Sequence, residues 1–321
     1  MQRNLLFIVI GLLLSQIGFS QVSGRVIDVN GEPLSYVNIY LEGTSIGTTS
    51  NLDGFYKLEI SEGTNTIVFQ YIGYRTVEQS INNTGEFVSL DVVLEDQVYT
   101  LDQVVIAADA EDPAYAIIRK AREKKEFYLK QFDNYSCDAY VKGFNKITDA
   151  PDKIFGREIG DLEGAIDSTG QGIVYLSESV SKLYVKGSEK KEVLYSSKVS
   201  GDPQGYSFNS AGEIDFSFYE NTIDFNRALV SPIANNCFAH YDYTLEGVYY
   251  ENDKVVNNIK VIPKNKYGNV VYGNIFIVED EWNIKSLQLQ TTKEATQIPF
   301  IDSLQVQQEY HQIEDLSLIH I

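Results

Sequence analysis

The sequence predicts a mainly β fold: an N-terminal β-sandwich, one connecting α-helix, and then a curved antiparallel β-meander. Three observations predict it. Apolar residues alternate at period two through most of the chain, and Gly- and Asn-containing turns separate the alternating runs. Only residues 112–131 repeat their apolar positions at helical spacing. A chain of 321 residues is long enough for two or three domains with their own cores.

Residues 1–20 have the pattern of a removable signal peptide. Arg3 supplies the basic start, residues 5–14 supply the apolar centre, and Ser20 is the small residue before the cut. A membrane-spanning helix needs roughly 20 apolar residues, about twice the length of this run. No cysteine follows the cut, which argues against a lipoprotein anchor. We therefore expect the protein to be exported.

Residues 21–96 are predicted to form the sandwich. Turns fall at Asn30-Gly31, Gly43, Gly47 and Asp53-Gly54, where a positive φ is least costly for Gly and Asn. The apolar residues between these turns should face one core, for example Val37, Ile39 and Leu41, then Tyr56, Leu58 and Ile60. Such a module buries a core and presents loops, but it holds no catalytic groups.

The same residues carry a resemblance to a known family. The order Gly24-x-Val26-x-Asp28, Gly31-x-Pro33-Leu34, Gly43, Gly47 and Asp53-Gly54-x-Tyr56 resembles the carboxypeptidase-regulatory-like (transthyretin-like) domain. That domain also lies at the N-terminus of many TonB-dependent outer-membrane receptors. In metallocarboxypeptidases it is the accessory sandwich, so the resemblance implies a non-catalytic module.

Residues 97–132 are predicted to be a linker strand followed by the helix. The run 101–106 is a short apolar strand, similar to one that precedes the plug domain of TonB-dependent receptors, although no plug-like sequence follows. Asp112 as N-cap and Pro113 at the first helical position open the helix. The basic run 119–126 is interpreted as a solvated helix face, with contact to lipid phosphates as the alternative.

Residues 133–315 are predicted to form an antiparallel β domain, and residues 316–321 are left as an unassigned tail. Polar loops are expected at 148–171 and 200–213, and turns at 252–253 and 267–269. Because some strands are apolar on both faces, the meander needs cover on both sides, and the helix is the best candidate for one cover. The expected strands are 135–144, 172–178, 182–185, 192–198, 241–250, 255–263, 270–278 and 282–291.

This half resembles the middle domain of a Gram-negative outer-membrane-associated family of unknown function. The matching pieces include Asp112-Pro113-Ala114-Tyr115, Tyr135-x-Cys137-x-x-Tyr140, Ser231-Pro232-Ile233-Ala234 and Tyr272-Gly273-Asn274-Ile275. Members of that family continue into a region that looks like an outer-membrane barrel, so the resemblance implies that this chain is truncated before its C-terminal barrel. The meander is also similar to the curved sheet of periplasmic lipoprotein carriers of the LolA type.

Charge and motifs point away from most catalytic classes. The formal net charge of −19 repels nucleic acid and anionic lipid. His311-x-x-Glu314, with His320 nearby, matches a metallocarboxypeptidase spacing, but the catalytic domain that should surround it is absent, so no metal site is predicted. His240 has no obvious nucleophile partner, and the glycines lie in turns rather than in phosphate loops. Residues 28–31 and 51–54 resemble calcium-loop fragments without the distal acid and are interpreted as turns.

Two weak modification signals remain. Cys137 and Cys237 are candidates for a disulfide in an oxidising compartment, with buried free thiols as the alternative. Ser168 and Ser303, in Asp-Ser-Thr and Asp-Ser-Leu, resemble acceptors of O-glycosylation in some Gram-negative envelopes.

Together these patterns predict a non-enzymatic cell-envelope protein without a cofactor. Its modules would act in the periplasm or at the outer membrane, in contact with envelope proteins or with its own C-terminal barrel domain. The alternative is a carrier of an apolar ligand, a lipid or a lipoprotein, in the curved sheet. A TonB-dependent-receptor-like transport component and a metallocarboxypeptidase rank below both.

Overall fold

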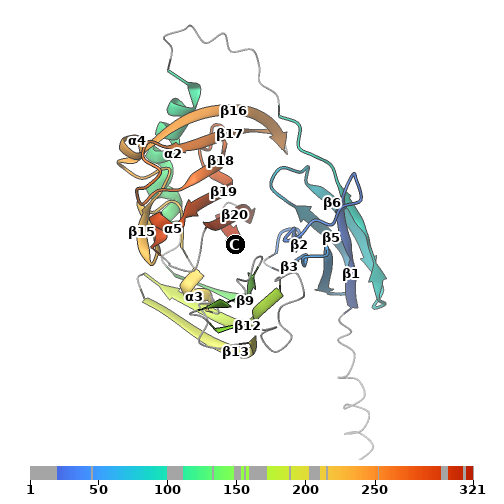
Figure 1. Cartoon of the computed structure of the whole chain (residues 1–321). Coiled ribbons are helices and arrows are strands. Elements are labelled where there is room, and N and C mark those ends of the chain that lie inside the picture. The colour runs from blue at the N-terminus through green and yellow to red at the C-terminus, as the bar shows by residue number, and fades with distance from the viewer. Residues whose placement is uncertain are drawn as a thin grey trace, which may run out of the picture.

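The computed structural model of the chain confirms the mainly β fold class (Figure 1). It describes residues 20–44, 46–99, 111–131, 134–147, 153–154, 157–158, 172–187, 189–201, 210–214, 216–251, 253–297, 303–313 and 316–320. The linker run 101–106 predicted as a strand lies outside these residues.

The N-terminal module is a sandwich of two four-stranded sheets. One sheet holds β4 (Phe55–Ile60), β1 (Ser20–Asp28), β7 (Val88–Ser89) and β8 (Val92–Leu94). The other holds β3 (Gly47–Thr49), β2 (Asn38–Leu41), β5 (Gly63–Gln70) and β6 (Val77–Asn83). Burial alternates along β4 as its sequence predicts, with Tyr56, Leu58 and Ile60 inside. These three side chains join Val22, Val26, Leu34, Val37, Ile39, Leu41, Ile67, Phe69, Val92 and Leu94 in one core.

Two glycines of the sandwich motif are required by close backbone approach. A Cβ at Gly24 would overlap the carbonyl of Leu90, because β1 runs directly against the chain before β8. A Cβ at Gly54 would meet the carbonyl oxygen of Val26 at 2.5 Å, and the φ of +79° at Gly54 is itself strained for other residues. Steric contact therefore explains why the motif places glycine at both positions.

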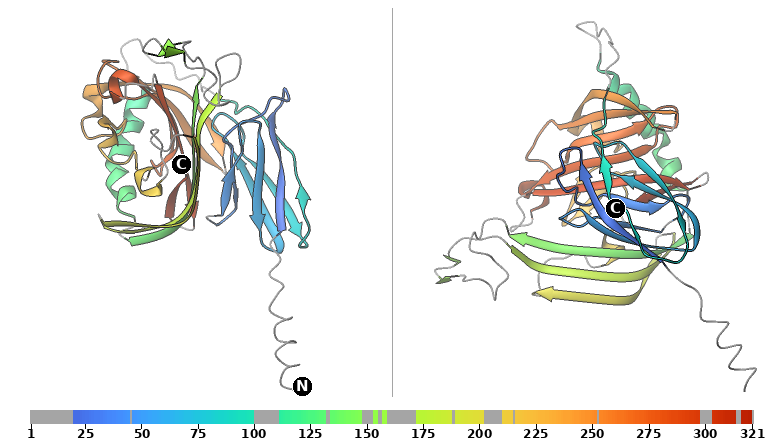
Figure 2. Two further views of the ribbon diagram at one scale, coloured as in Figure 1. Left: turned by 60° about the horizontal axis from the view of Figure 1, so that its bottom comes forward. Right: turned by 90° about the vertical axis from the view of Figure 1, so that its right-hand side faces the viewer.

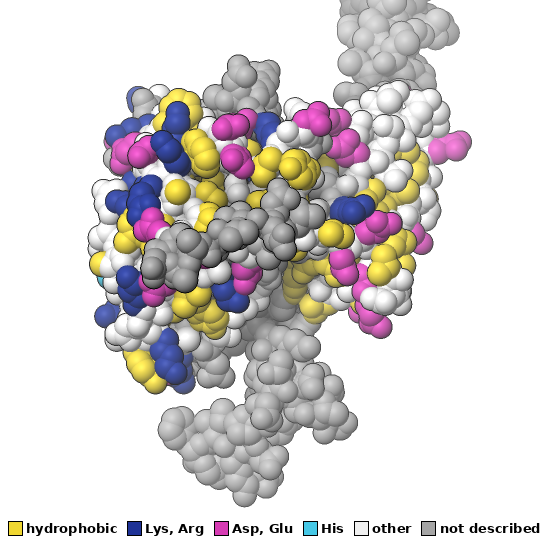
Figure 3. Space-filling model, turned by 90° about the horizontal axis from the view of Figure 1, so that it is seen from above, with side chains coloured by type: hydrophobic (Ala, Val, Ile, Leu, Met, Phe, Trp, Pro, Cys, Tyr) yellow, Lys and Arg dark blue, Asp and Glu magenta, His cyan; other side chains and the backbone are white. Residues whose placement is uncertain are grey.

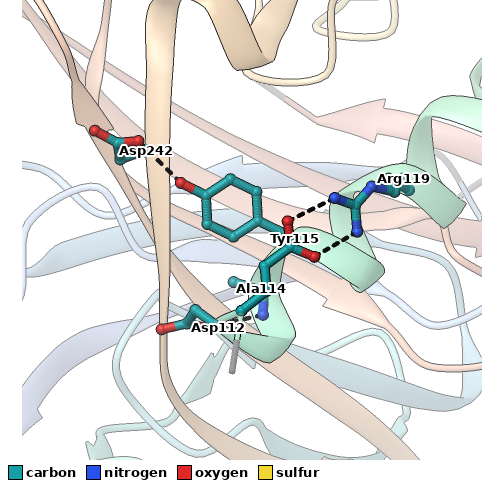
Figure 4. Close-up of polar contacts among 6 residues, drawn as sticks. Asp112, Ala114, Tyr115, Arg119 and Asp242 are labelled. Carbon is teal, nitrogen blue, oxygen red and sulfur yellow. Dashed lines mark hydrogen bonds and ion pairs between the residues drawn. The ribbon is translucent and has the colours of Figure 1, made fainter. Parts of the chain in front are cut away.

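Helix α2 (Pro113–Leu129) begins where the sequence predicts and is fixed to the second module at its first turn (Figure 4). The Asp112 carboxylate accepts hydrogen bonds from the backbone N–H of Ala114 at 2.9 Å and of Leu245 at 3.0 Å. The Tyr115 hydroxyl donates to Asp242 at 2.9 Å. Asp112 thus caps the helix and ties it to the neighbouring strand in one arrangement.

The main sheet of the second module has six antiparallel strands in sequence order. They are β16 (Tyr241–Glu251), β17 (Lys254–Pro263), β18 (Tyr272–Val278), β19 (Ile284–Thr292), β20 (Ser303–Ile313) and β21 (Leu316–His320). The predicted meander of four strands is therefore extended by two. The tail that the sequence left unassigned contributes β21, which pairs with the end of β20.

A second sheet of three long strands, β13 (Glu189–Gly201), β12 (Gly172–Lys186) and β9 (Asn134–Ile147), lies below the main sheet in Figure 1. The prediction of separate strands at 172–178 and 182–185 was wrong, because β12 runs through both. Its inward residues Ser177, Ser179 and Ser181 are buried but polar, which hides the alternation in the sequence.

Several short elements were not predicted. The hairpin of β14 (Thr222–Phe225) and β15 (Arg227–Val230) and the one-turn helices α3 (Ala211–Ile214), α4 (Cys237–His240) and α5 (Lys293–Thr296) lie around the second module. The pair β10 (Lys153–Ile154) and β11 (Arg157–Glu158) falls in the predicted loop 148–171.

The main sheet is covered on both faces, by different parts of the chain (Figure 2). Helix α2 lies on one side, where Ile118 and Ala121 are 0% exposed and share a core with Ile275 and Ile277 of β18. The sandwich lies on the other side, where Phe276 of the same strand packs in a small cluster with residues of both modules. The expectation that the helix covers one face is confirmed, and the sandwich supplies the second cover.

Candidate functional site

A cavity of about 560 Å³ lies where the sandwich meets the main sheet. We call it the inter-module groove. The sandwich contributes the turn after β5, the start of β6 and the chain beyond β8, and the sheet contributes β16, β18, β19 and β20. Its lining residues are Gln70, Tyr71, Ile72, Gly73, Tyr74, Arg75, Thr76, Glu78, Gln97, Val98, Tyr99, Tyr249, Tyr250, Glu251, Phe276, Ser286 and Glu309.

Backbone hydrogen bonds hold the sandwich wall of the groove in shape. A turn at residues 71–74 is closed by the N–H of Tyr74 donating to the carbonyl of Tyr71, with Gly73 at a φ of +91°. The N–H of Arg75 donates to Glu95, and the N–H of Gln97 donates to Gly73. The segment after β8 therefore runs beside this turn, and the two together present their side chains to the sheet.

Aromatic rings from both modules line the groove. Tyr71 and Tyr74 stack on the sandwich side, with ring centroids 5.5 Å apart. Tyr99 packs edge-to-face on Tyr249 at 5.8 Å and stacks on Phe276 at 6.4 Å. Ring pairs at these distances stabilise beyond the area that they bury. The contact between the modules therefore depends on specific aromatic geometry as well as on apolar burial.

Two glutamates of the main sheet form hydrogen bonds with the sandwich. Glu309 of β20 is 3% exposed and accepts a hydrogen bond from the Asn38 side-chain amide of β2 at 2.7 Å. Glu251 at the end of β16 accepts from the Thr76 hydroxyl at 2.7 Å and pairs with Lys285 at 3.1 Å. Each module thus supplies one partner in both cross-module hydrogen bonds.

The environment of Glu309 favours its neutral form. Burial raises the pKa of the Glu309 carboxyl to about 7, and the nearby charge of Glu251 acts in the same direction. The Asn38 hydrogen bond and the Lys285 charge oppose that increase in pKa without cancelling it. Near neutral pH this carboxyl is therefore shared between its acid and its anionic form.

Charge is distributed unevenly between the two covers of the sheet. Residues 21–99 carry three Lys or Arg against eleven Asp or Glu, whereas α2 carries five basic against two acidic side chains. Figure 3 shows acidic side chains over the sandwich at the right and basic ones gathered on the side that holds α2. The groove thus opens beside the acidic module, which disfavours anionic ligands.

The structure describes only some of the residues that the sequence singled out. Cys237 is a buried free thiol of α4, and the side chain of Cys137 on β9 lies outside the described residues, so their pairing stays a prediction. Ser303 is exposed at the start of β20, whereas Ser168 lies outside the described residues, and the glycosylation of both stays a prediction.

Among the described residues, no group of three or more His, Cys, Asp or Glu is placed to hold a metal. His240 is half-buried and bonds to the side chain of Asn236. The side chains of His311 and His320 and the whole of Glu314 lie outside the described residues.

The two calcium-loop fragments form turns, as they were interpreted. Asp28 accepts the backbone N–H groups of Asn30 and Glu32, and Asn51 accepts those of Asp53 and Phe55. Both side chains therefore satisfy their own backbone.

Across the described part of the chain, no helix has the length and apolar character needed to cross a membrane.

Sequence comparison gives two matches that follow the two modules. Residues 117–320 match "Family of unknown function (DUF5686)", and residues 22–106 match "CarboxypepD_reg-like domain". Since the first match covers more than half of the chain, the protein belongs to the DUF5686 family. Both resemblances expected from the sequence are confirmed.

The curated relatives are similar over the N-terminal third only. TonB-dependent receptor SusC of Bacteroides thetaiotaomicron is 34% identical over 109 residues, which is 33% of this chain and 10% of the receptor. TonB-dependent receptor P39 of Formosa agariphila is 31% identical over 99 residues, 31% of this chain and 9% of the receptor. The chain thus spans about a tenth of the length of these relatives.

Solved structures match weakly. A DUF3823 family protein from Bacteroides ovatus is 11% identical, with 56% of this chain and 97% of that chain covered, at a TM-score of 0.22. A streptococcal ancillary pilin is 12% identical, with 59% and 61% covered, at a TM-score of 0.22. At these TM-scores the similarity supports no conclusion about the fold or the function of this chain.

Proposed function

We propose that this DUF5686 protein is a non-enzymatic binding protein of the cell envelope, and that its sandwich and curved sheet form one recognition unit. The observation that carries the proposal is the inter-module groove, whose walls come from both modules. The Asn38–Glu309 and Thr76–Glu251 hydrogen bonds hold those walls together. Domain interfaces are among the preferred places for ligand pockets, and the volume of this cavity lies in the usual range for them.

An envelope location is supported by two independent observations. Residues 1–20 have the pattern of a signal peptide, and the sandwich is similar to TonB-dependent receptors. We place the modules in the periplasm, beside envelope proteins or beside an outer-membrane part of the same protein. Mass spectrometry of the exported protein should give a mature N-terminus at Gln21, and an intact residue 1–20 segment would contradict the export proposal.

The apolar-carrier alternative receives less support. A carrier needs an open apolar sheet face, but Ile118, Ile275 and Leu287 on the α2 side are each 0% exposed. The opposite face is occupied by the sandwich, and its groove is lined by polar groups as well as rings. The two covers thus favour recognition at a groove over enclosure of a lipid.

The enzymatic alternative makes a different prediction. A metallocarboxypeptidase would retain zinc and remove C-terminal residues, whereas we expect the purified chain to do neither. Metal analysis and a peptide-cleavage assay test this directly. One tightly held zinc that is lost on His311→Ala would contradict the non-enzymatic proposal.

In-cell photo-crosslinking tests the groove itself. A photoreactive phenylalanine analogue replaces Tyr250, which lines the groove and is 68% exposed. The matched control is the same replacement at Tyr267, which is 66% exposed and lies outside the groove lining. We expect a defined adduct at position 250 and none at 267. Equal labelling at both positions, or none at 250, would remove the groove as the recognition site.

A further inference from the structure

We propose that the inter-module groove binds a neutral, polyhydroxylated ligand, namely a chain of uncharged sugars. This inference rests on the proposed function, since it names the ligand class of the same groove. Three properties of the lining lead to it: flat aromatic rings, internally paired charges, and a mixture of hydrogen-bond donors and acceptors.

The aromatic rings are placed on both walls. Tyr71 and Tyr74 lie on the sandwich wall, and Tyr249 lies on the sheet wall, so a ligand in the groove meets tyrosine from two sides. A tyrosine presents an apolar face and a polar hydroxyl tip. A sugar ring has the matching surface, because its C–H groups form an apolar face and its hydroxyl groups lie around the edge.

Charge argues for an uncharged ligand. Glu251 is paired with Lys285 at 3.1 Å, and Arg75 is paired with Glu95 at 3.7 Å. Glu309 is buried against Asn38, in surroundings that favour its neutral form. A cation would therefore find Glu251 and Glu309 already engaged, while an anion would be repelled by Glu78 and by the acidic sandwich.

The polar lining argues against an apolar ligand. Thr76 and Ser286 supply hydroxyl groups, Gln97 supplies an amide, and Glu251 supplies acceptor oxygens. Covering these groups with a hydrocarbon chain would remove their water without replacing its hydrogen bonds, which is unfavourable. Sugar hydroxyl groups both donate and accept, so they can replace that water.

Isothermal titration calorimetry with the mature full chain at pH 7 tests the proposal. The probes are cellohexaose, maltohexaose, xylohexaose and mannohexaose, with an oligogalacturonate as the anionic comparison and myristate as the apolar one. We expect at least one neutral hexasaccharide to bind, and the galacturonate and myristate not to bind. Failure of all four neutral sugars, or binding of only the charged or the apolar probe, would overturn the inference.

Alanine substitutions of tyrosines test whether the sugar binds in the groove. Tyr74→Ala and Tyr71→Ala should each weaken binding of the neutral sugar by about tenfold or more, since each removes a ring that lines the groove. Tyr267→Ala, at a tyrosine outside the groove lining, should leave the affinity unchanged. Affinity that is unaltered in both groove variants would contradict the proposal. A photo-adduct at position 250 with a protein, without sugar binding, would retain the proposed function and reject this ligand class.

Discussion

The two faces of the main sheet are covered in different ways, although neighbouring residues of one strand serve both. On β18, Ile275 and Ile277 pack under α2 in a large, closed apolar core. Phe276 and Val278 face the sandwich in a cluster of three fully buried residues with Ile72, Tyr99 and Tyr249 around it. The first face is built for stability. The second combines rings, paired charges and a buried acid around a cavity, which is typical of a surface that binds.

Breaking the α2 face should have the largest effect. Ile118 is 0% exposed in the core of that face, so Ile118→Asp buries a charge without a partner. We expect the second module to lose about 4–5 kcal/mol of unfolding free energy. Urea unfolding followed by circular dichroism measures the loss.

The sandwich should be insensitive to that change. Residues 21–99 expressed alone should unfold cooperatively, because their core is complete within the sandwich. An Ile118→Asp variant that melts like the wild type would mean that α2 does not stabilise the main sheet.

Breaking the sandwich face should have a smaller effect. Phe276 is 4% exposed and its ring contacts Tyr99 and Tyr249, so Phe276→Ala removes a buried ring between the modules. We expect a loss of about 3 kcal/mol. Phe87, which is 63% exposed on the sandwich, provides the control Phe87→Ala with little change. Equal losses of unfolding free energy in Phe276→Ala and Phe87→Ala would mean that the aromatic cluster does not stabilise the contact between the sandwich and the main sheet.

The two faces also differ in how far the sequence predicts them. Sandwich and helix follow from local signals, since alternation, turn glycines and the Asp112-Pro113 start all lie within a few residues of the structure they specify. The groove does not. Its cross-module hydrogen bonds join Thr76 to Glu251, 175 residues apart, and Asn38 to Glu309, 271 residues apart.

Strand β20 was not predicted from the sequence, and its buried residues explain why. Two successive buried positions of the strand are polar: Glu309 faces the sandwich, and Gln308 lies on the opposite face, where it donates to the carbonyl of Phe216. A period-two pattern of apolar residues is therefore weak there, and pairing with β19 defines the strand instead. Docking of two modules decides which tyrosines and glutamates meet, and no local pattern carries that information.

Titration of Glu309 should make the stability of the sandwich face, unlike that of the α2 face, depend on pH. Its pKa is raised from 4.5 to about 7, with Asn38, Lys285, Glu251, Tyr40 and Tyr71 as the polar or titratable groups around it. Because the folded form binds the proton more tightly, the stabilisation is fully present below about pH 4.5 and is lost as the pH rises through 7.

Glu309→Gln isolates this effect. The variant should match the wild type near pH 4.5 and exceed it above pH 7 by up to ~3 kcal/mol, since its side chain stays neutral. Urea unfolding at several pH values gives the difference, and Glu78→Gln, at an exposed groove position, serves as the control. Parallel pH profiles for the wild type and Glu309→Gln would show that Glu309 does not titrate in the interface.

The smallest effect should come from Asn38→Ala, and its pH dependence sharpens the comparison. Asn38 donates to Glu309 across the modules at 2.7 Å, so the variant leaves a buried carboxyl with one donor fewer. A hydrogen bond to an anionic acceptor is about twice as strong as a neutral one. We therefore expect a loss of about 1 kcal/mol at pH 5 and about 2 kcal/mol at pH 8. Asn82→Ala, at an exposed position of β6, should change stability little at either pH. A loss that is the same at both pH values would mean that Glu309 keeps one protonation state, and the sandwich face would then be a fixed contact like the α2 face.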